Sequence, residues 1–242
     1  MLTTMSSHEI EELRELLRRL READVKLRVF GAYCHKYRLR PTLTEAELQQ
    51  FEQTHKVKLP EDYRMFLREI GNGEAGPFYG LDPLERAAQG RDLSQPFPFT
   101  KATDSYSDEE LNQWGDCEEY PGILEICSRG CAIGFYIVVN GPTYGTMWEG
   151  REDFYPWERS FGMWYRRWLE RALRTLVNEP LMAKLTLGMT KEQVVASTGG
   201  DWKVIKNVYN ADYYLVAPEM PAQLLLSGEN GVIKEIRPWP SI

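Results

Sequence analysis

Three glycines have the spacing of a cofactor-binding loop. Gly71, Gly73 and Gly76 match the Gly-x-Gly-x-x-Gly pattern of dinucleotide-binding proteins. In those proteins a strand precedes the glycines and a helix follows them, so that the helix N-terminus faces the pyrophosphate. Here a run with helical spacing precedes the glycines, and Pro77 follows them directly. We interpret the glycines as a helix C-cap and a turn, and we expect no cofactor.

Two cysteines, Cys127 and Cys131, have a spacing that could suit metal ligands. A structural zinc site requires four ligands, and no Cys-x-x-Cys or His-x-x-x-His pattern supplies two more. Because the two cysteines flank a predicted hairpin turn, we expect both side chains to fill the sheet interior as small apolar groups. The sequence therefore predicts no metal site.

The acid–base groups are scattered along the chain. His8, His35 and His55 are isolated from one another, and His55 shares a predicted helical face with Phe51, which is typical of a half-buried packing residue. The carboxylate pairs are adjacent in sequence, so nothing places a general acid opposite a general base. We predict no catalytic residues and no enzymatic activity.

Charge is distributed unevenly along the 242 residues. The formal net charge of −7 argues against nucleic-acid binding driven by overall charge. Residues 1–40 carry net +3, residues 41–125 carry net −11 and the remainder carries net +1. Between residues 104 and 125 there are eight carboxylates and no Lys or Arg. This run is either a solvated loop or a surface whose field attracts a basic partner.

Length and composition fit a folded protein with one large domain or two smaller ones. Hydrophobic residues make up 43% of the chain and aromatic residues 12%. No apolar run approaches the length of a membrane-spanning helix, and the first residues have no apolar core like that of a signal peptide. Four cysteines are too few for a disulfide framework. We expect a cytoplasmic protein without membrane association.

Local patterns predict the helices that must position any site. Three capping boxes, in which a hydroxyl precedes Glu or Gln by three residues, mark helix starts at Ser6/Glu9, Thr44/Glu47 and Thr190/Gln193. The first predicts a helix over residues 7–23. A further helix starts at Pro60 and carries an apolar stripe formed by Tyr63, Phe66, Leu67 and Ile70. Loose alternation over residues 25–29 predicts a short strand between the first two helices.

Strands dominate the later part of the chain. Residues 123–139 predict two strands joined by a turn at residues 128–130, and residues 144–148 predict a third. A helix over residues 160–177 follows and ends before Pro180. After the third capping box, strands are predicted at residues 202–206, 213–217, 223–227 and 232–239. The fold class is α+β, with an N-terminal helix (1–24), a main domain (25–180) and a small helix-plus-antiparallel-sheet domain (186–242).

An ordered series of short motifs is similar to the SUKH superfamily. The first half of the series is Phe51-Glu52, Leu59-Pro60, Asn72-Gly73 and Gly76-Pro77-x-Tyr79-Gly80-Leu81. The second half is Gly130-Cys131, Gly141-x-x-x-Gly145-x-x-Trp148, Ser160-Phe161 and Trp164-Tyr165-x-x-Trp168. The resemblance covers residues 25–177 and leaves the acidic run at residues 100–120 unmatched. Residues 187–199 resemble the helix entry of small β-lactamase-inhibitor-protein-like domains.

The resemblance implies helices packed on one side of a mostly antiparallel sheet, and a binding module without catalytic residues. The superfamily includes fungal cell-wall-synthesis regulators and many bacterial immunity proteins against toxins such as nucleases. We therefore expect a protein that binds and neutralises a basic toxin domain; the alternatives are a housekeeping scaffold or regulatory adaptor and an unrecognised enzyme. The predicted partner-binding residues come from the acidic run and from the turn that carries Phe78 and Tyr79, which we call the aromatic turn. They are Phe78, Tyr79, Asp108, Glu109, Glu110, Trp114, Asp116, Glu118 and Glu119.

Overall fold

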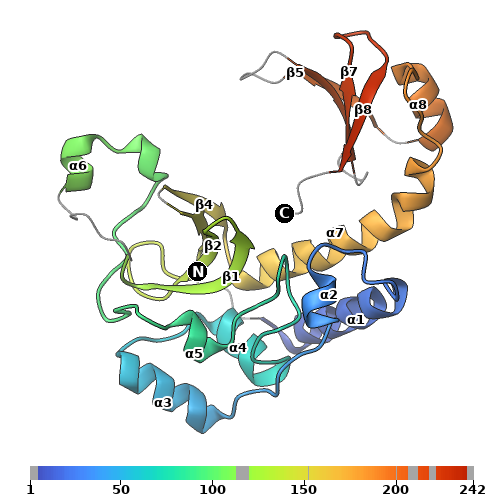
Figure 1. Ribbon diagram of the computed structural model, residues 1–242. Coiled ribbons are helices and arrows are strands. Elements are labelled where there is room, and N and C mark those ends of the chain that lie inside the picture. Colours follow the sequence, from blue (N-terminus) through green and yellow to red (C-terminus); the bar gives the residue numbers. More distant parts are fainter. Residues whose placement is uncertain are drawn as a thin grey trace. The chain divides into compact units, whose positions relative to one another are not determined.

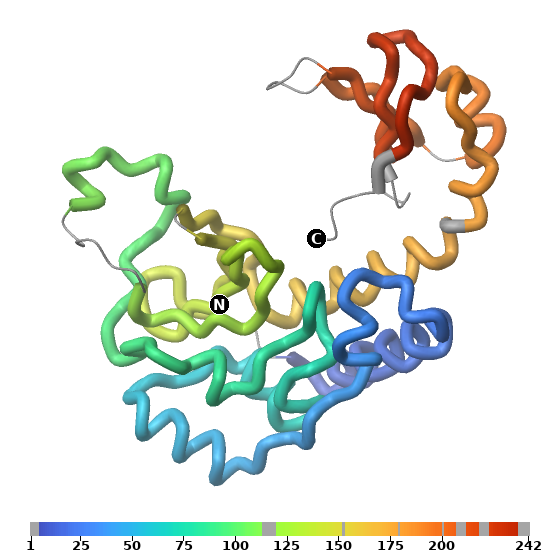
Figure 2. The backbone as a smooth tube through the Cα atoms, in the orientation of Figure 1, coloured from blue at the N-terminus to red at the C-terminus, as the bar shows by residue number. Residues whose placement is uncertain are grey.

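A computed structural model describes residues 5–112, 120–151, 153–199, 201–206, 212–217 and 222–238. The chain divides into two compact units, residues 1–169 and 170–242, with the division inside one long helix (Figures 1 and 2). Each unit contains its own four-stranded antiparallel sheet. The predicted α+β fold class is confirmed.

The first unit begins with helix α1 (Ser7–Ala23). Its capping box is formed, because the Ser6 hydroxyl accepts the Glu9 amide N–H while the Glu9 side chain accepts the Ser6 amide N–H. Four apolar residues along one side of α1 are buried: Ile10, Leu13, Leu17 and Leu20. The predicted helix over residues 7–23 is confirmed.

The next segment differs from the prediction. Residues 25–29 form no strand, and the chain instead enters a short helix, α2 (Ala32–His35). The reason is the buried Asp24 carboxylate, which accepts the amide N–H groups of Arg28 and Val29 at 2.7 and 2.9 Å. These bonds satisfy amides that a strand would need for its ladder, and they hold the segment as a turn.

Three helices follow before the first sheet in the chain. Helix α3 (Glu45–His55) starts at the predicted Thr44 capping box, and helix α4 (Glu61–Glu69) starts at Pro60. The predicted stripe of α4 is buried, with Phe66 packed against two aromatic rings of a later helix. Helix α5 (Leu84–Ala87) lies after the aromatic turn.

The first sheet has the strand order β1 (Ile123–Gly130), β2 (Ile133–Val138), β3 (Met147–Gly150) and β4 (Phe154–Glu158). The predicted hairpin exists, but its turn consists of Cys131 and Ala132, both with positive φ, rather than residues 128–130. This places Cys127 in the core and Cys131 on the surface, so the expectation that both cysteines fill the sheet interior is wrong for Cys131. The sequence analysis predicts no strand at β4, because Pro156 interrupts the run of strand-forming residues there.

Between α5 and β1 lie a 3-10 turn, η1 (Thr103–Ser105), and helix α6 (Asp108–Asn112). An aromatic cluster in which Phe97, Phe99, Trp148 and Phe154 are buried underlies this region. Tyr106 and Leu111 pack against the cluster, so the apolar side of the acidic run is anchored in a core.

Helix α7 (Phe161–Met182) is longer than predicted. The sequence interpretation ended the helix before Pro180, whereas the structure contains Pro180 inside it. Pro180 lies in the last turn, where its missing N–H costs one hydrogen bond, and the residues after it, Leu181 and Met182, pack against the core of the second unit. That apolar contact favours continuation of the helix beyond the proline.

The second unit contains helix α8 (Lys191–Thr198), which starts at the predicted Thr190 capping box. Its sheet has the order β5 (Lys203–Lys206), β6 (Tyr213–Val216), β7 (Ala222–Leu226) and β8 (Ile233–Pro238), close to the predicted strands. Val194 of α8 and Trp202 lie in its core, and the Trp202 indole N–H donates to the Thr198 hydroxyl at 2.9 Å.

Candidate interaction surfaces

The acidic part of the predicted surface lies on α6. Asp108, Glu109 and Glu110 are all exposed. The Ser107 amide N–H donates to the Glu110 carboxylate at 2.8 Å, and this bond is the main reason that the pKa of Glu110 lies below its usual value. Lys101 lies over the Tyr106 ring at 4.2 Å and adds a smaller effect in the same direction. The helix therefore presents three exposed carboxylates from an element anchored on its apolar side.

Four further residues of the predicted surface, Trp114, Asp116, Glu118 and Glu119, lie outside the described residues.

The aromatic part of the predicted surface is divided between core and solvent. Phe78 is only 3% exposed and its ring stacks on Phe135 at 5.3 Å, so it offers little surface to a partner. Tyr79 is 44% exposed, and its ring contacts Phe30 edge-on with centroids 5.4 Å apart. Phe78 thus fixes the turn from inside, and Tyr79 projects from it.

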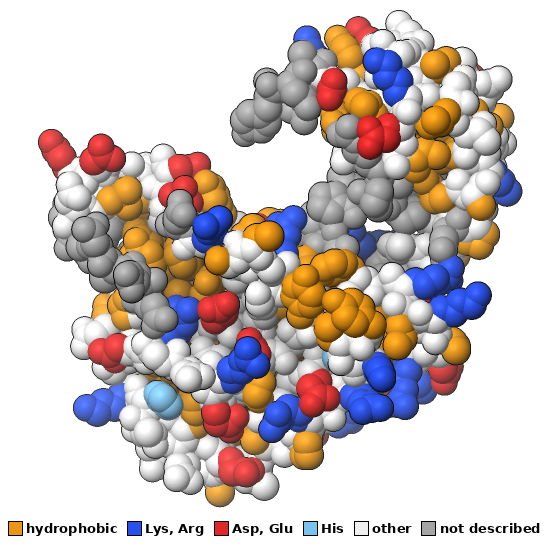
Figure 3. Space-filling model, viewed as in Figure 1, with side chains coloured by type: hydrophobic (Ala, Val, Ile, Leu, Met, Phe, Trp, Pro, Cys, Tyr) orange, Lys and Arg blue, Asp and Glu red, His pale blue; other side chains and the backbone are white. Residues whose placement is uncertain are grey.

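Two residues that the sequence interpretation did not include join Tyr79. Phe30 is 43% exposed, and Tyr33 at the start of α2 is 61% exposed. We call Phe30, Tyr33 and Tyr79 the aromatic surface. Figure 3 shows hydrophobic side chains gathered over α2 and the segment that precedes α5. The sequence signal is the pair of aromatic residues, Phe30 and Tyr33, on either side of Gly31 and just after the strand predicted at residues 25–29.

A backbone contact holds the aromatic surface together. Gly31 has φ of +77°, and a Cβ built there would lie 1.4 Å from the Phe78 carbonyl oxygen. Only glycine permits this approach, which joins the segment before α2 to the aromatic turn. Phe78 itself has φ of +51°, a conformation that a bulky residue adopts only where surrounding contacts impose it.

The structure separates the two parts of the predicted surface. In Figures 1 and 2, α6 and α2 lie on different sides of the first unit, and the aromatic turn lies beside α2.

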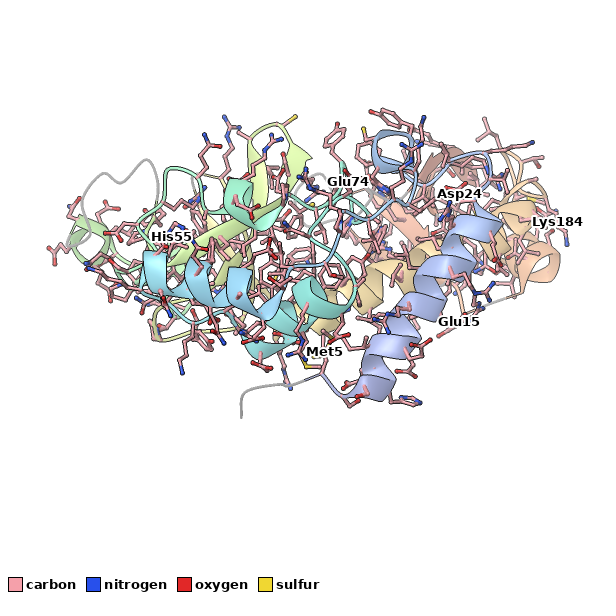
Figure 4. The ribbon with its side chains drawn as sticks, turned by 90° about the horizontal axis from the view of Figure 1, so that it is seen from below. Met5, Glu15, Asp24, His55, Glu74 and Lys184 are labelled. Atoms are coloured by element: carbon pink, nitrogen blue, oxygen red, sulfur yellow. The ribbon has the colours of Figure 1, made fainter. Side chains whose placement is uncertain are left out.

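Most of the charged residues around the aromatic turn are basic. Tyr79 borders a cleft of about 510 Å³, which we call the basic cleft, whose charged lining is Lys36, Arg38, Arg40, Arg86, Glu74 and Asp82. Figure 4 labels Glu74, which belongs to this lining, and Asp24, which directly follows α1.

His35 also lines the basic cleft, as a neutral group. Its Nδ1 accepts the Tyr37 amide N–H at 3.0 Å, which leaves the ring proton on Nε2, and Nε2 is buried without a hydrogen bond of normal geometry. Burial lowers the pKa of His35 to about 4, against the opposing effect of the Gly76 carbonyl. At neutral pH the positive charge of the cleft therefore comes from its Lys and Arg side chains alone.

Two kinds of feature are absent from the part of the chain that the structure describes. No three His, Cys, Asp or Glu side chains gather there in a way that could hold a metal ion. No helix there has both the length and the apolar character needed to cross a membrane.

Comparison with known proteins gives a family. No curated protein matches the chain. The model of the SMI1 / KNR4 family (SUKH-1) matches residues 42–167, which include α3, α4, the aromatic turn, α6, the first sheet and the start of α7. The match does not reach residues 187–199, so the likeness of the tail to β-lactamase-inhibitor-protein-like domains stays a prediction. The match covers more than half of the chain and contains the motif series read from the sequence up to Tyr165, and the chain belongs to the SMI1 / KNR4 family (SUKH-1).

Proposed function

We propose that this protein is a non-catalytic binding module that neutralises a basic toxin domain, such as a nuclease, through helix α6. Membership of the SMI1 / KNR4 family is consistent with an immunity or regulatory protein. The observation that carries the choice is α6 itself, where Asp108, Glu109 and Glu110 are exposed while Leu111 is anchored in the aromatic cluster. The carboxylates are thus held at one place on the surface.

Such an arrangement acts mainly on the rate of association. Exposed charges on one partner steer an oppositely charged partner during diffusional encounter, and salt screens this effect. Asp108 and Glu109 make little contribution to folding, because exposed charges contribute little to stability, whereas the Glu110 side chain also accepts the Ser107 amide N–H at the start of α6. Steering and folding can therefore be measured separately.

The test uses the natural partner, captured from the source cells with the tagged full-length protein. The triple variant Asp108→Lys, Glu109→Lys, Glu110→Gln keeps an acceptor for the Ser107 amide N–H and should associate about tenfold more slowly at low ionic strength. The difference should shrink as salt is added. The matched control Glu11→Lys, Glu15→Lys, Glu22→Gln changes net charge equally at residues that are exposed on α1. Equal loss in both variants, or no loss in the α6 variant, contradicts a binding role for α6.

The alternative function, a regulatory adaptor, is favoured by one specific observation. The aromatic surface and the basic cleft lie apart from α6, and an adaptor needs separate surfaces for separate partners. The identity of the captured protein decides between the two: a basic nuclease or other toxin supports neutralisation, whereas a biosynthetic or signalling enzyme supports the adaptor.

A further inference from the structure

We propose that the aromatic surface and the basic cleft together form a second docking site, which binds an acidic segment of a partner protein that also carries apolar side chains. This site is distinct from α6, and its ligand has the opposite charge from the partner proposed for α6. The proposal does not depend on toxin neutralisation.

The first argument is the charge of the cleft. Lys36, Arg38 and Arg40 are exposed, and none of the ion pairs found among the described residues uses them. Several other arginines of the first unit are paired, and Arg18 of α1, for example, lies 2.7 Å from Glu15 and 2.6 Å from Glu22. The cleft therefore keeps cations that no carboxylate among the described residues pairs with.

The acidic residues of the cleft do not cancel this charge. Asp82 lies 3.1 Å from Arg86, so these two side chains form a pair of their own. Glu74 is the other carboxylate in the lining, opposite three cations. The field of the cleft favours an anionic ligand, and arginine guanidinium groups match the geometry of a carboxylate through paired N–H donors.

The second argument is the adjoining apolar area. Tyr79 belongs to both features, since it lines the cleft and contacts Phe30. Exposed aromatic side chains are expensive to leave in water and are enriched among residues that dominate binding energy. A ligand that covers both features must place carboxylates against the cations and an apolar side chain against the rings.

The third argument is preorganisation. The Asp24 carboxylate accepts the Tyr37 hydroxyl at 2.7 Å in addition to the amides of Arg28 and Val29, which fixes the segment that carries Phe30 and Tyr33. The contact of Gly31 with the Phe78 carbonyl fixes this segment against the turn that carries Tyr79. A surface fixed before binding loses little entropy when a ligand arrives.

The ligand is a protein segment rather than a nucleic acid. Nucleic-acid sites extend along the phosphate backbone and require a broad positive surface. Here the cations gather at one cleft of a chain whose net charge is −7. An acidic peptide meets the cleft and the aromatic surface without approaching the acidic parts of the chain.

The experiment uses the ¹⁵N-labelled full-length protein and a synthetic peptide of alternating Glu and Leu with one Trp. Two control peptides replace every Glu by Gln, or every Leu and the Trp by Ala. We expect the acidic apolar peptide to shift the amide signals of residues 30–40 and 79–86, with α6 unaffected. Both control peptides should bind at least about tenfold more weakly than the acidic apolar peptide.

Variants assign the binding to the cleft. Arg38→Glu with Arg40→Glu should weaken peptide binding about tenfold or more, whereas Arg19→Glu with Arg21→Glu, an equal charge change on α1, should leave it unchanged. Circular dichroism checks that both variants fold. Tyr79→Ser is a second variant that keeps the charges and should also weaken binding.

Three results would overturn the proposal: equal binding of the Glu and Gln peptides, shifts spread over all basic residues, or equal loss in both double variants. Self-association of the protein through α6 of one copy and the cleft of another would also overturn it, and sedimentation equilibrium would show this as a mass that rises with concentration. Failure here is distinguishable from failure of the proposed function, because the α6 triple variant should bind the peptide normally.

Discussion

At the scale of single residues, His35 is a buried group whose protonation opposes folding. Its ring lies against Tyr37 and Trp168, with centroids 5.3 and 6.3 Å away, and burial lowers its pKa to about 4. In the unfolded chain the pKa of a histidine is about 6.5. Between these values the unfolded state binds the additional proton, so the folded state loses stability as the pH falls from about 6.5 toward about 4.

We expect the free energy of unfolding to fall by about 2 kcal/mol between pH 7 and pH 5 through His35. Urea denaturation at both pH values measures it. The variant His35→Asn retains an acceptor near Nδ1 for the Tyr37 amide but cannot titrate, so it should be less stable at pH 7 and lose about 2 kcal/mol less on acidification. The same pH dependence in both proteins would mean that folding does not lower the pKa of His35.

At the scale of elements, α7 decides where the chain is open to proteases. A helix that ends before Pro180, as the sequence predicts, would leave residues 178–184 open to cleavage. The structure continues the helix to Met182, and the segment before α8 begins at residue 183. Proteolysis requires local unfolding, which a hydrogen-bonded helix resists more than a connecting segment does.

We therefore expect brief trypsin treatment to cut after Lys184, an exposed residue of this segment, before it cuts after Arg171 or Arg174 within α7. Mass spectrometry of the first fragments identifies the site. The variant Lys184→Gln should remove the early cleavage and leave the later pattern intact. Early cutting inside α7 would contradict a continuous helix.

At the scale of the whole molecule, each unit has a core built from its own residues. Phe66 is fully buried in the first unit between Phe161 and Tyr165, with ring centroids 4.9 and 4.8 Å away. Trp202 is 2% exposed in the core of the second unit. Truncation of either side chain leaves a cavity that nearby groups fill only in part.

We expect Phe66→Ala and Trp202→Ala each to destabilise its own unit by about 3–5 kcal/mol. Native-state hydrogen exchange, read peptide by peptide, measures the two units in one experiment. Phe66→Ala should raise exchange in β1–β4 and leave β5–β8 unchanged, and Trp202→Ala should do the reverse. Raised exchange in both sheets for either variant would show that the chain unfolds as one cooperative unit.

The sequence by itself determined the features that depend on neighbours in the chain. The three capping boxes formed as predicted, because each needs only a hydroxyl and a carboxylate or amide three residues apart. The buried stripe of α4, the strands of the second sheet and the family motifs were also readable, since periodicity of 3.6 or 2 residues follows from local backbone geometry. The acidic run was visible as composition, and α6 keeps its carboxylates exposed.

The tertiary structure alone decided what depends on residues distant in sequence. The Asp24 carboxylate captures the amides that a strand would use, and the core of the second unit extends α7 past Pro180. Tyr79 meets Phe30 rather than α6, because Gly31 admits the Phe78 carbonyl. Such contacts leave no periodic signal in the sequence, since the free energy of each is set by the packing of segments that only the folded chain brings together.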